Sequence, residues 1–92
     1  MWVRRPPAIL WGMAFFLLHS RHDEAECPAA YAAWRGFESP LRRSAPYATC
    51  LWGGHEVWWE TEAETESTAL EQLPPFVAER ARAIRVTRAR LP

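Results

Sequence analysis

Lysine and asparagine are absent from this sequence of 92 residues. The remaining basic residue type, arginine, only balances the acids: 11 basic and 11 acidic residues give a formal net charge of zero. A nucleic-acid-binding domain normally carries a basic excess on one face, so we expect no nucleic acid partner. The absence of lysine and asparagine beside abundant arginine and alanine indicates the codon usage of a GC-rich bacterial genome, and it says nothing about function.

Cysteines and long apolar runs are scarce as well. Two cysteines, Cys27 and Cys50, are too few for the disulfide framework of a small secreted domain. Arg21 closes the first apolar run before it reaches the roughly 20 residues of a transmembrane helix. That run follows two arginines, as in a signal peptide, but no cleavage site of small residues comes after it. We expect a cytoplasmic protein without a membrane span, with residues 1–12 a dispensable leader and residues 13–92 a single domain.

Several catalytic signatures are missing. The sequence has no Ser-His-Asp set, phosphate-binding glycine loop or dinucleotide fingerprint. Apolar surface is plentiful instead, because 49% of the residues are hydrophobic and six are tryptophan. A core of this length hides a smaller share of its surface than a larger core does. Apolar surface that such a core cannot bury predicts an interface with a partner, most simply in a homodimer, or a ligand cavity.

The first half of the chain predicts a strand followed by a helix. Residues 14–18 are apolar at every position, which is typical of a strand buried on both faces. Asp23 and Glu26 then have the spacing of a capping box. An apolar stripe at three- and four-residue spacing predicts a helix over residues 28–37. The side chains of the strand alternate, so Phe16, Leu18, Ser20 and His22 share one face, and Phe15, Leu17, His19 and Arg21 share the other.

The second half predicts two strands, a helix and a last strand. A capping box at residues 61–64 opens the helix, and the proline pair at 74–75 ends it. A short helical segment restarts at Pro75. Residues 83–89 alternate apolar and charged side chains, as in a half-exposed strand. The whole order is strand, helix, strand, strand, helix, strand.

Gly53 and Gly54 separate two extended runs, residues 47–52 and 55–61. A two-residue glycine loop between such runs predicts a β-hairpin in which Ala48 pairs with Trp59. Strand alternation then assigns an apolar set to one face of the hairpin, which we expect to cover a core. This set contains Ala48, Cys50, Trp52, His55, Val57 and Trp59.

With this element order the chain resembles the dimeric α/β-barrel superfamily of ferredoxin-like domains over residues 13–92. The stretches MAFFLLHSRHDEAECPAA, GGHEVWWETEA and LPPF carry the likeness. Within it the chain resembles a subgroup of small bacterial proteins with a His-x4-Cys-Pro motif and a later Gly-His hairpin. The resemblance implies an α+β fold with a four-stranded antiparallel sheet, two helices on one face, and a dimer packed sheet to sheet. The matching positions are His22, Cys27, Pro28, Gly54 and His55.

Histidine and cysteine supply the obvious site chemistry. His22 and Cys27 lie where the first strand ends and the next helix begins, a place where rigid scaffolds often hold functional groups. If His22 faces the same side as Cys50 and His55, three or four N and S ligands converge, as zinc or copper prefers. Taken singly, Cys50 is most simply a small core residue, His55 a turn residue and His19 structural. The candidate metal ligands are His22, Cys27 and His55.

Two function hypotheses follow and both stay open at this point. The first is a homodimer that handles a small organic molecule, with His22 and His55 as acid, base or anchor. The superfamily that the chain resembles includes isomerases and monooxygenases without a cofactor, so the resemblance implies an enzyme of that type. Its pocket would be lined by Trp34, Trp58 and Trp59, since such pockets are mostly apolar with a few polar anchors. The alternative is a non-catalytic protein that binds zinc or copper or serves as an interaction partner.

Overall fold

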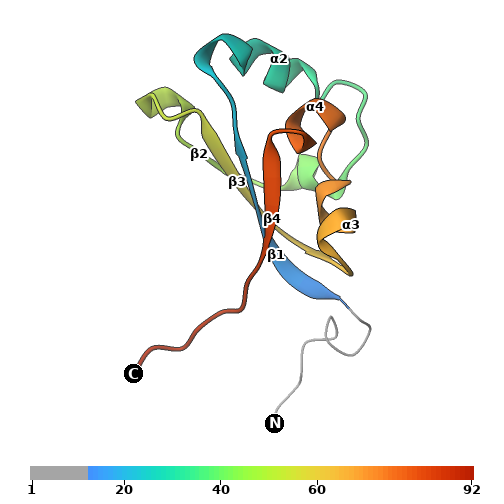
Figure 1. Cartoon of the computed structure of the whole chain (residues 1–92), viewed down its shortest axis with the longest axis vertical. Coiled ribbons are helices and arrows are strands. Elements are labelled where there is room, and N and C mark those ends of the chain that lie inside the picture. Colours follow the sequence, from blue (N-terminus) through green and yellow to red (C-terminus); the bar gives the residue numbers. More distant parts are fainter. Residues whose placement is uncertain (1–12) are drawn as a thin grey trace.

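The computed structural model describes residues 13–92 and has an α+β architecture built on a four-stranded antiparallel sheet (Figure 1). The expected leader, residues 1–12, lies outside the described residues. The strand order is β2-β3-β1-β4, which is compatible with the ferredoxin-like class. The strands are β1 (Ala14–Arg21), β2 (Tyr47–Ala48), β3 (Glu56–Ala63) and β4 (Ala81–Arg85).

Strand β1 lies in the middle of the sheet and pairs with β3 from Ala14 to Arg21. Its side chains divide between two faces as predicted: Phe16, Leu18 and Ser20 are buried on one face, and the residues between them are exposed or half-buried. Within one chain only one face of β1 is fully covered: Phe15, on the other face, keeps 45% of its surface exposed. The expected burial on both faces is thus not reached in a single chain.

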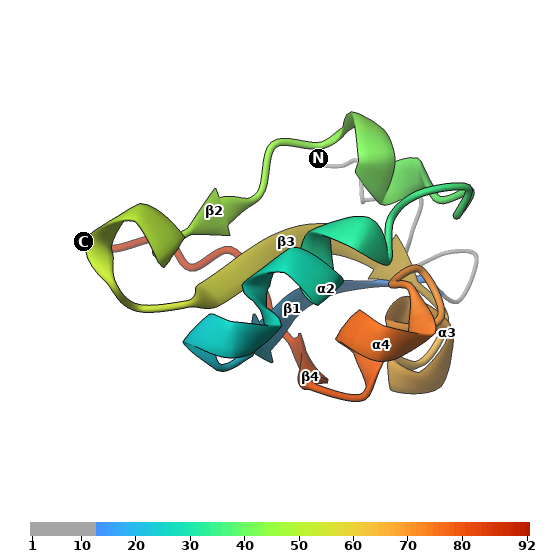
Figure 2. The ribbon, with the colours of Figure 1, turned by 90° about the horizontal axis from the view of Figure 1, so that it is seen from above.

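The helices α2, α3 and α4 lie along one side of the sheet, as Figures 1 and 2 show from two directions. Buried Leu41 of η2, Val77 of α4 and Leu73, which lies between α3 and α4, pack with Phe16 and Leu18 in one hydrophobic cluster. The helical segments are η1 (Glu24–Glu26), α2 (Cys27–Ala32), η2 (Pro40–Arg43), η3 (Cys50–Trp52), α3 (Glu66–Leu70) and α4 (Pro75–Ala78).

Two helix boundaries differ from the sequence-based expectation. Helix α2 ends at Ala32 rather than at residue 37, and turns lead to Gly36, whose φ of 72° favours glycine. The predicted capping box at residues 61–64 is wrong, because β3 continues to Ala63 in pairing with β1. Helix α3 is capped instead by Thr65, whose hydroxyl accepts from the Thr68 N–H at 3.1 Å.

The hairpin before β3 also differs. Ala48 pairs with Val57 rather than with Trp59, so the register is shifted by two residues. Residues 50–52 form the 3₁₀ turn η3, and Trp52, expected on the core face, is 87% exposed. A shift of two leaves every strand residue on its predicted face, since side chains alternate with a period of two.

Candidate metal centre

Two histidines and two cysteines come together at the end of the sheet where β1 ends and β3 begins. One ligand atom from each lies within 4.8 Å of the ligand atoms of the other three. His22 is buried, and the other three are half-buried. The residues follow β1, open α2, open η3 and precede β3, so four separate segments contribute. The group consists of His22, Cys27, Cys50 and His55, and we call it the His-Cys cluster.

A backbone contact ties the two histidines of the cluster together. The His22 N–H donates to the His55 carbonyl at 3.2 Å, which extends the β1–β3 pairing past its last strand residues. The two imidazole rings lie with centroids 5.6 Å apart and tilted by 59°. Strand alternation turns His22 toward the helix side of the sheet, as it does Phe16 and Leu18. Both rings are therefore held at one end of the core.

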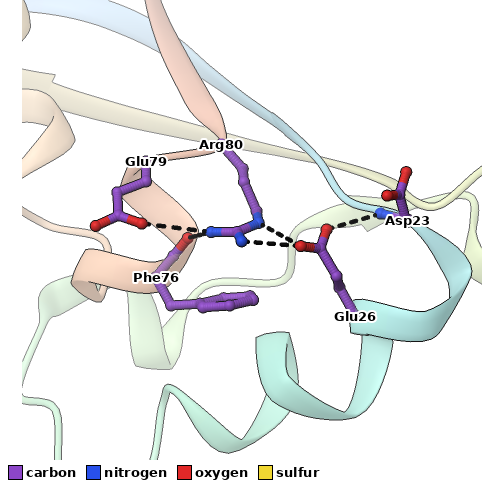
Figure 3. A network of polar contacts seen from close by, with 5 residues as sticks. All are labelled: Asp23, Glu26, Phe76, Glu79 and Arg80. Atoms are coloured by element: carbon purple, nitrogen blue, oxygen red, sulfur yellow. Dashed lines mark hydrogen bonds and ion pairs between the residues drawn. The ribbon is translucent and has the colours of Figure 1, made fainter.

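Cys27 is positioned by a polar network around the turn before it (Figure 3). The Glu26 carboxylate accepts from the Asp23 N–H at 3.0 Å, as the predicted capping box requires. The same carboxylate accepts from Nε and Nη2 of Arg80 at 3.1 and 2.8 Å. The Arg80 guanidinium in turn lies 3.7 Å from the centre of the Phe76 ring. The turn that leads into Cys27 is thereby fastened to the end of α4.

The charge of Glu26 is favoured by this arrangement. The Arg80 hydrogen bonds, followed by the bond from the Asp23 N–H, lower the pKa of Glu26 below its usual value. The carboxylate thus stays ionised near neutral pH and keeps its contact with Arg80. The fixed turn lets Pro28 occupy the first turn of α2, where its missing N–H costs nothing.

The loop that carries Cys50 and His55 is organised by Thr49. The Thr49 carbonyl accepts from the N–H groups of Trp52 and Gly54 at 2.8 and 2.9 Å. The Thr49 hydroxyl accepts from the Glu56 N–H at 3.1 Å. A Cβ on Gly54 would lie 2.7 Å from the Cβ of Thr49, so this close approach requires glycine. These contacts replace the expected two-residue turn and fold Cys50 back toward His22.

His55 has two features that are unusual for an ordinary turn residue. Its φ of 54° lies in the left-handed region, where a non-glycine residue is strained. Its buried Nδ1 has no hydrogen-bond partner among residues 13–92. An unpaired buried polar atom costs free energy, and a bound metal ion would offset that cost. Strain and an unpaired nitrogen at one residue favour a functional role over a purely structural one.

The donor set fits a tetrahedral metal. The His22 Nε2 and Cys50 Sγ atoms are 3.9 Å apart. Ligand atoms at zinc distances of about 2.0–2.3 Å in a tetrahedron are separated by roughly 3.5 Å. Burial, followed by the neighbouring Cys27 thiol, raises the pKa of Cys50. Two thiols that lose their protons and two neutral imidazoles in this space can bind a thiophilic cation.

A cavity of about 330 Å³ borders the cluster between the sheet and the helical segments. His22 and Cys50 belong to its wall, and Cys27 and His55 do not. Trp34 also lines the cavity, as does its neighbour Trp59, whose ring centroid lies 6.0 Å away. The further lining residues are Ser20, Ala30, Tyr31, Leu41, Arg42, Ser44, Pro46, Ala48, Val57, Phe76, Val77 and Arg80.

His19 and Trp58 lie on the face of the sheet that points away from the helices. His19 Nε2 is 2.7 Å from the Glu56 carboxylate. Its ring stacks on Trp58 with centroids 5.0 Å apart and an interplanar angle of 17°. Of the three tryptophans proposed for a pocket, Trp34 and Trp59 share the cavity, while Trp58 does not line it.

The candidate ligands His22, Cys27 and His55, drawn from two distant stretches of the sequence, do converge. Cys50 joins them, although its surroundings in the sequence favour a core residue; its place on the His55 face of the hairpin was the available signal. Arg80 was missed altogether, because nothing in a sequence relates it to Glu26, 54 positions away.

Comparison with known proteins gives no relative for this chain: no family model, no curated protein and no solved structure matches it. Among residues 13–92, no helix combines the length and the apolar character needed to span a bilayer.

Proposed function

We propose that this protein binds one transition-metal ion, zinc in the first place, through the His-Cys cluster. The convergence of four N and S ligand atoms within 4.8 Å carries the proposal. Tetrahedral sites with two sulfur and two nitrogen donors are typical of zinc. Copper, the other metal expected from the sequence, would share the soft thiolate ligands. A reducing, cytoplasmic setting would keep both cysteines available as ligands.

Four protein ligands define what kind of metal site this would be. Catalytic zinc keeps one position open for water, whereas structural zinc is enclosed by four protein side chains. With all four side chains bound, the ion would cross-link the end of β1, the start of α2 and the loop before β3. The proposed role is therefore non-catalytic: the ion stabilises this end of the domain.

Metal analysis of protein purified without a histidine tag tests the proposal. We expect one zinc per chain, and a cobalt-substituted protein with the thiolate charge-transfer band and the strong visible absorption of tetrahedral Co²⁺. His22→Ala and Cys27→Ser should each weaken zinc binding by at least about 100-fold, the upper range for changes in residues that merely support ligands.

His19→Ala is the matched control, because His19 lies on the opposite face and bonds Glu56. It should keep wild-type zinc affinity. Wild-type protein that binds neither zinc nor copper would overturn the proposal, as would ligand variants that bind zinc as tightly as His19→Ala does.

A second candidate function rests on the cavity. Its volume of about 330 Å³ and its Trp34 and Trp59 walls suit a small, flat organic ligand. In an isomerase or monooxygenase-type enzyme without a cofactor, His22 and His55 would act on that ligand as acid, base or anchor. The same imidazoles cannot serve a metal and a proton transfer at once, so the two functions predict opposite responses to zinc.

Ligand screening by tryptophan fluorescence and thermal shift, with and without zinc, separates them. An enzyme of this kind would bind its ligand in the metal-free protein and lose it on His22→Ala or Trp34→Ala. Zinc should inhibit it. If the screen finds no ligand for the zinc-bound or the metal-free protein, the small-molecule function is contradicted and the metal-binding function is unaffected.

We also propose that the protein forms a homodimer, in which the sheet faces not covered by helices pack against each other. This face carries partly exposed Phe15 and Val86, at 45% and 37%. Acidic side chains line its β3 side, including Glu62, whereas Arg82 lies on its β4 side. A two-fold axis along β1 would place β3 of each chain over β4 of the other, with Glu62 at the level of Phe15 and Arg82 at the level of His19.

Sedimentation measurements test the dimer. Phe15→Glu should shift the protein toward monomer, because it places a charge on an inner strand of the interface. Leu51→Glu is the control, since Leu51 is 94% exposed on η3. A wild-type monomer at micromolar concentration would contradict this part without affecting the metal site.

A further inference from the structure

Cys27 and Cys50 are the only cysteines of the chain; both are free, and both belong to the His-Cys cluster. We propose that they form a peroxide-responsive thiol pair: a hydroperoxide oxidises them to a disulfide, and the metal is released. The inference rests on the proposed metal site and adds its regulation. The oxidant class is a small hydroperoxide such as hydrogen peroxide.

The geometry places the two sulfurs within reach of each other. Their Sγ atoms are at most 4.8 Å apart, whereas a disulfide needs about 2.05 Å. The sulfurs must therefore approach by less than about 3 Å. Both cysteines open short helical turns rather than lying inside strands, Cys27 in α2 and Cys50 in η3. The proposed approach is a movement of η3, which lies outside the paired residues of the sheet.

Both thiols are half-buried, and they differ in their contact with the cavity. Cys50 lines the cavity together with His22, and Cys27 is not part of the cavity wall. A small peroxide that enters the cavity meets Cys50 first. We therefore assign Cys50 as the residue that the peroxide oxidises and Cys27 as the residue that resolves the product. Because burial raises the pKa of the free Cys50 thiol, this assignment depends on the thiolate that metal binding would produce.

The chemistry balances in two steps. The Cys50 thiolate attacks one peroxide oxygen; the O–O bond breaks, Cys50 becomes a sulfenic acid, and the other oxygen leaves as hydroxide and takes up a proton. The Cys27 thiolate then attacks the sulfenic sulfur. The S–S bond forms, the S–O bond breaks, and the second oxygen also leaves as water. The two sulfurs together lose two electrons, and the peroxide gains them.

Metal release follows from the ligand count. The disulfide removes two of the four donors and leaves the imidazoles of His22 and His55. A disulfide sulfur carries no charge and is a poor ligand compared with a thiolate. Two neutral nitrogens cannot hold zinc at the affinity of the complete site. Reduction of the disulfide would restore the thiolates and with them zinc binding.

The test uses the full-length zinc-loaded protein. Hydrogen peroxide is added stepwise, free zinc is followed with a chromophoric chelator, and intact mass reports the thiol state. We expect zinc release in step with a species that has lost two hydrogens, and recovery of binding after a disulfide reductant is added. Zinc that stays bound, or that leaves while only sulfinic or sulfonic acids form, would overturn the proposal.

Single variants decide the order of the two thiols. In Cys27→Ser, a sulfenic acid at Cys50 should accumulate and be trapped by dimedone. In Cys50→Ser, dimedone should label Cys27 several-fold less. Equal labelling in the two variants would contradict the assignment of Cys50 as the first target.

The metal-free protein separates the two proposals. If wild-type protein binds no zinc, the metal-site proposal fails. The metal-free protein then tests the thiol pair by itself: peroxide that produces the Cys27–Cys50 disulfide supports the pair, and peroxide that produces no disulfide overturns it. If zinc binds and peroxide yields no disulfide, the metal site stands and only the thiol pair fails.

Discussion

The two faces of strand β1 carry histidines in different surroundings. On the helix side, His22 is buried beside two thiols and a second imidazole. On the uncovered side, His19 is held by the Glu56 carboxylate at 2.7 Å and stacks on Trp58. The same residue type, three positions apart on one strand, is thus matched to a carboxylate on one face and to potential metal ligands on the other. The candidate site is therefore distinguished by the thiols and the second imidazole around His22, and not by the presence of a histidine alone.

Burial separates the two faces in the same way. Leu18, on the helix side, is fully buried, whereas its neighbour Leu17 is half-buried within the single chain. The covered face supplies the core, and the uncovered face supplies the surface that we assign to a second copy. The substitutions below act on one of the two faces or on the turns that lead to the cluster.

The largest effect should come from the core. Leu18→Ala should lower the free energy of unfolding by about 2–5 kcal/mol, through lost transfer energy and the cavity left behind. Leu17→Ala should cost clearly less in the monomer. Denaturant titration at low protein concentration measures both. Equal losses would mean that the outer face is buried as deeply as the core, as in a dimer that persists at that concentration.

The next effect concerns the loop that brings Cys50 and His55 to the covered face. Gly54→Ala should reduce zinc affinity by about 10–100-fold, as changes behind metal ligands commonly do, because the new Cβ collides with Thr49. Gly36→Ala is the control, since a Cβ there meets nothing within 4 Å. It should lower stability through its positive φ and leave zinc affinity unchanged. Competition titration with a zinc chelator reports both constants.

A smaller effect is expected on the uncovered face. Glu56→Gln weakens the contact with His19, and partly exposed ion pairs of this kind contribute up to about 1 kcal/mol. Thermal unfolding should show this loss, and zinc affinity should not change. A fall in zinc affinity in Glu56→Gln would contradict the separation of the two faces.

The smallest effect depends on pH. Arg80 lowers the pKa of Glu26, so this pair stabilises the fold above the unfolded carboxyl value of 4.5, and the stabilisation is lost as pH falls through the lowered folded value. Wild-type protein should therefore unfold at a higher temperature than Glu26→Gln near pH 7. The difference should disappear in more acidic solution. A difference that is constant down to the most acidic pH would exclude the ion pair as its cause.

Alternation made the site partly predictable. It places His22 on the face of Phe16 and Leu18, and it keeps Val57 and Trp59 on the helix side despite a hairpin register that is wrong by two. Cys50 and His55 lie outside the paired strand residues. The loop itself was beyond prediction, because it depends on hydrogen bonds that converge on Thr49 rather than on the glycine pair. The Thr65 cap was hidden for a related reason: threonine stands at Thr68, where the usual pattern has a glutamate.

The fold class followed from element order, but the extent of the helices did not. Helix α2 is six residues long, and its sequence continues in the same apolar pattern beyond its end. Tertiary contacts decide where it stops, among them the bond from Arg42 to the Trp34 carbonyl at 2.6 Å. The spacing of such residues matches neither the helix period nor the strand period, so the sequence pattern does not predict these contacts.

The positions of the four cluster residues also have a consequence for synthesis. All four donors lie within the first 55 residues, whereas Arg80, which fastens the turn before Cys27, and strand β4 come last. A chain emerging from the ribosome therefore carries the complete donor set before its sheet can be finished. Arg80 can bond Glu26 only after this part of the chain has been made. A chain truncated before Arg80 would therefore keep the four donors but lose the contact that fixes the turn before Cys27.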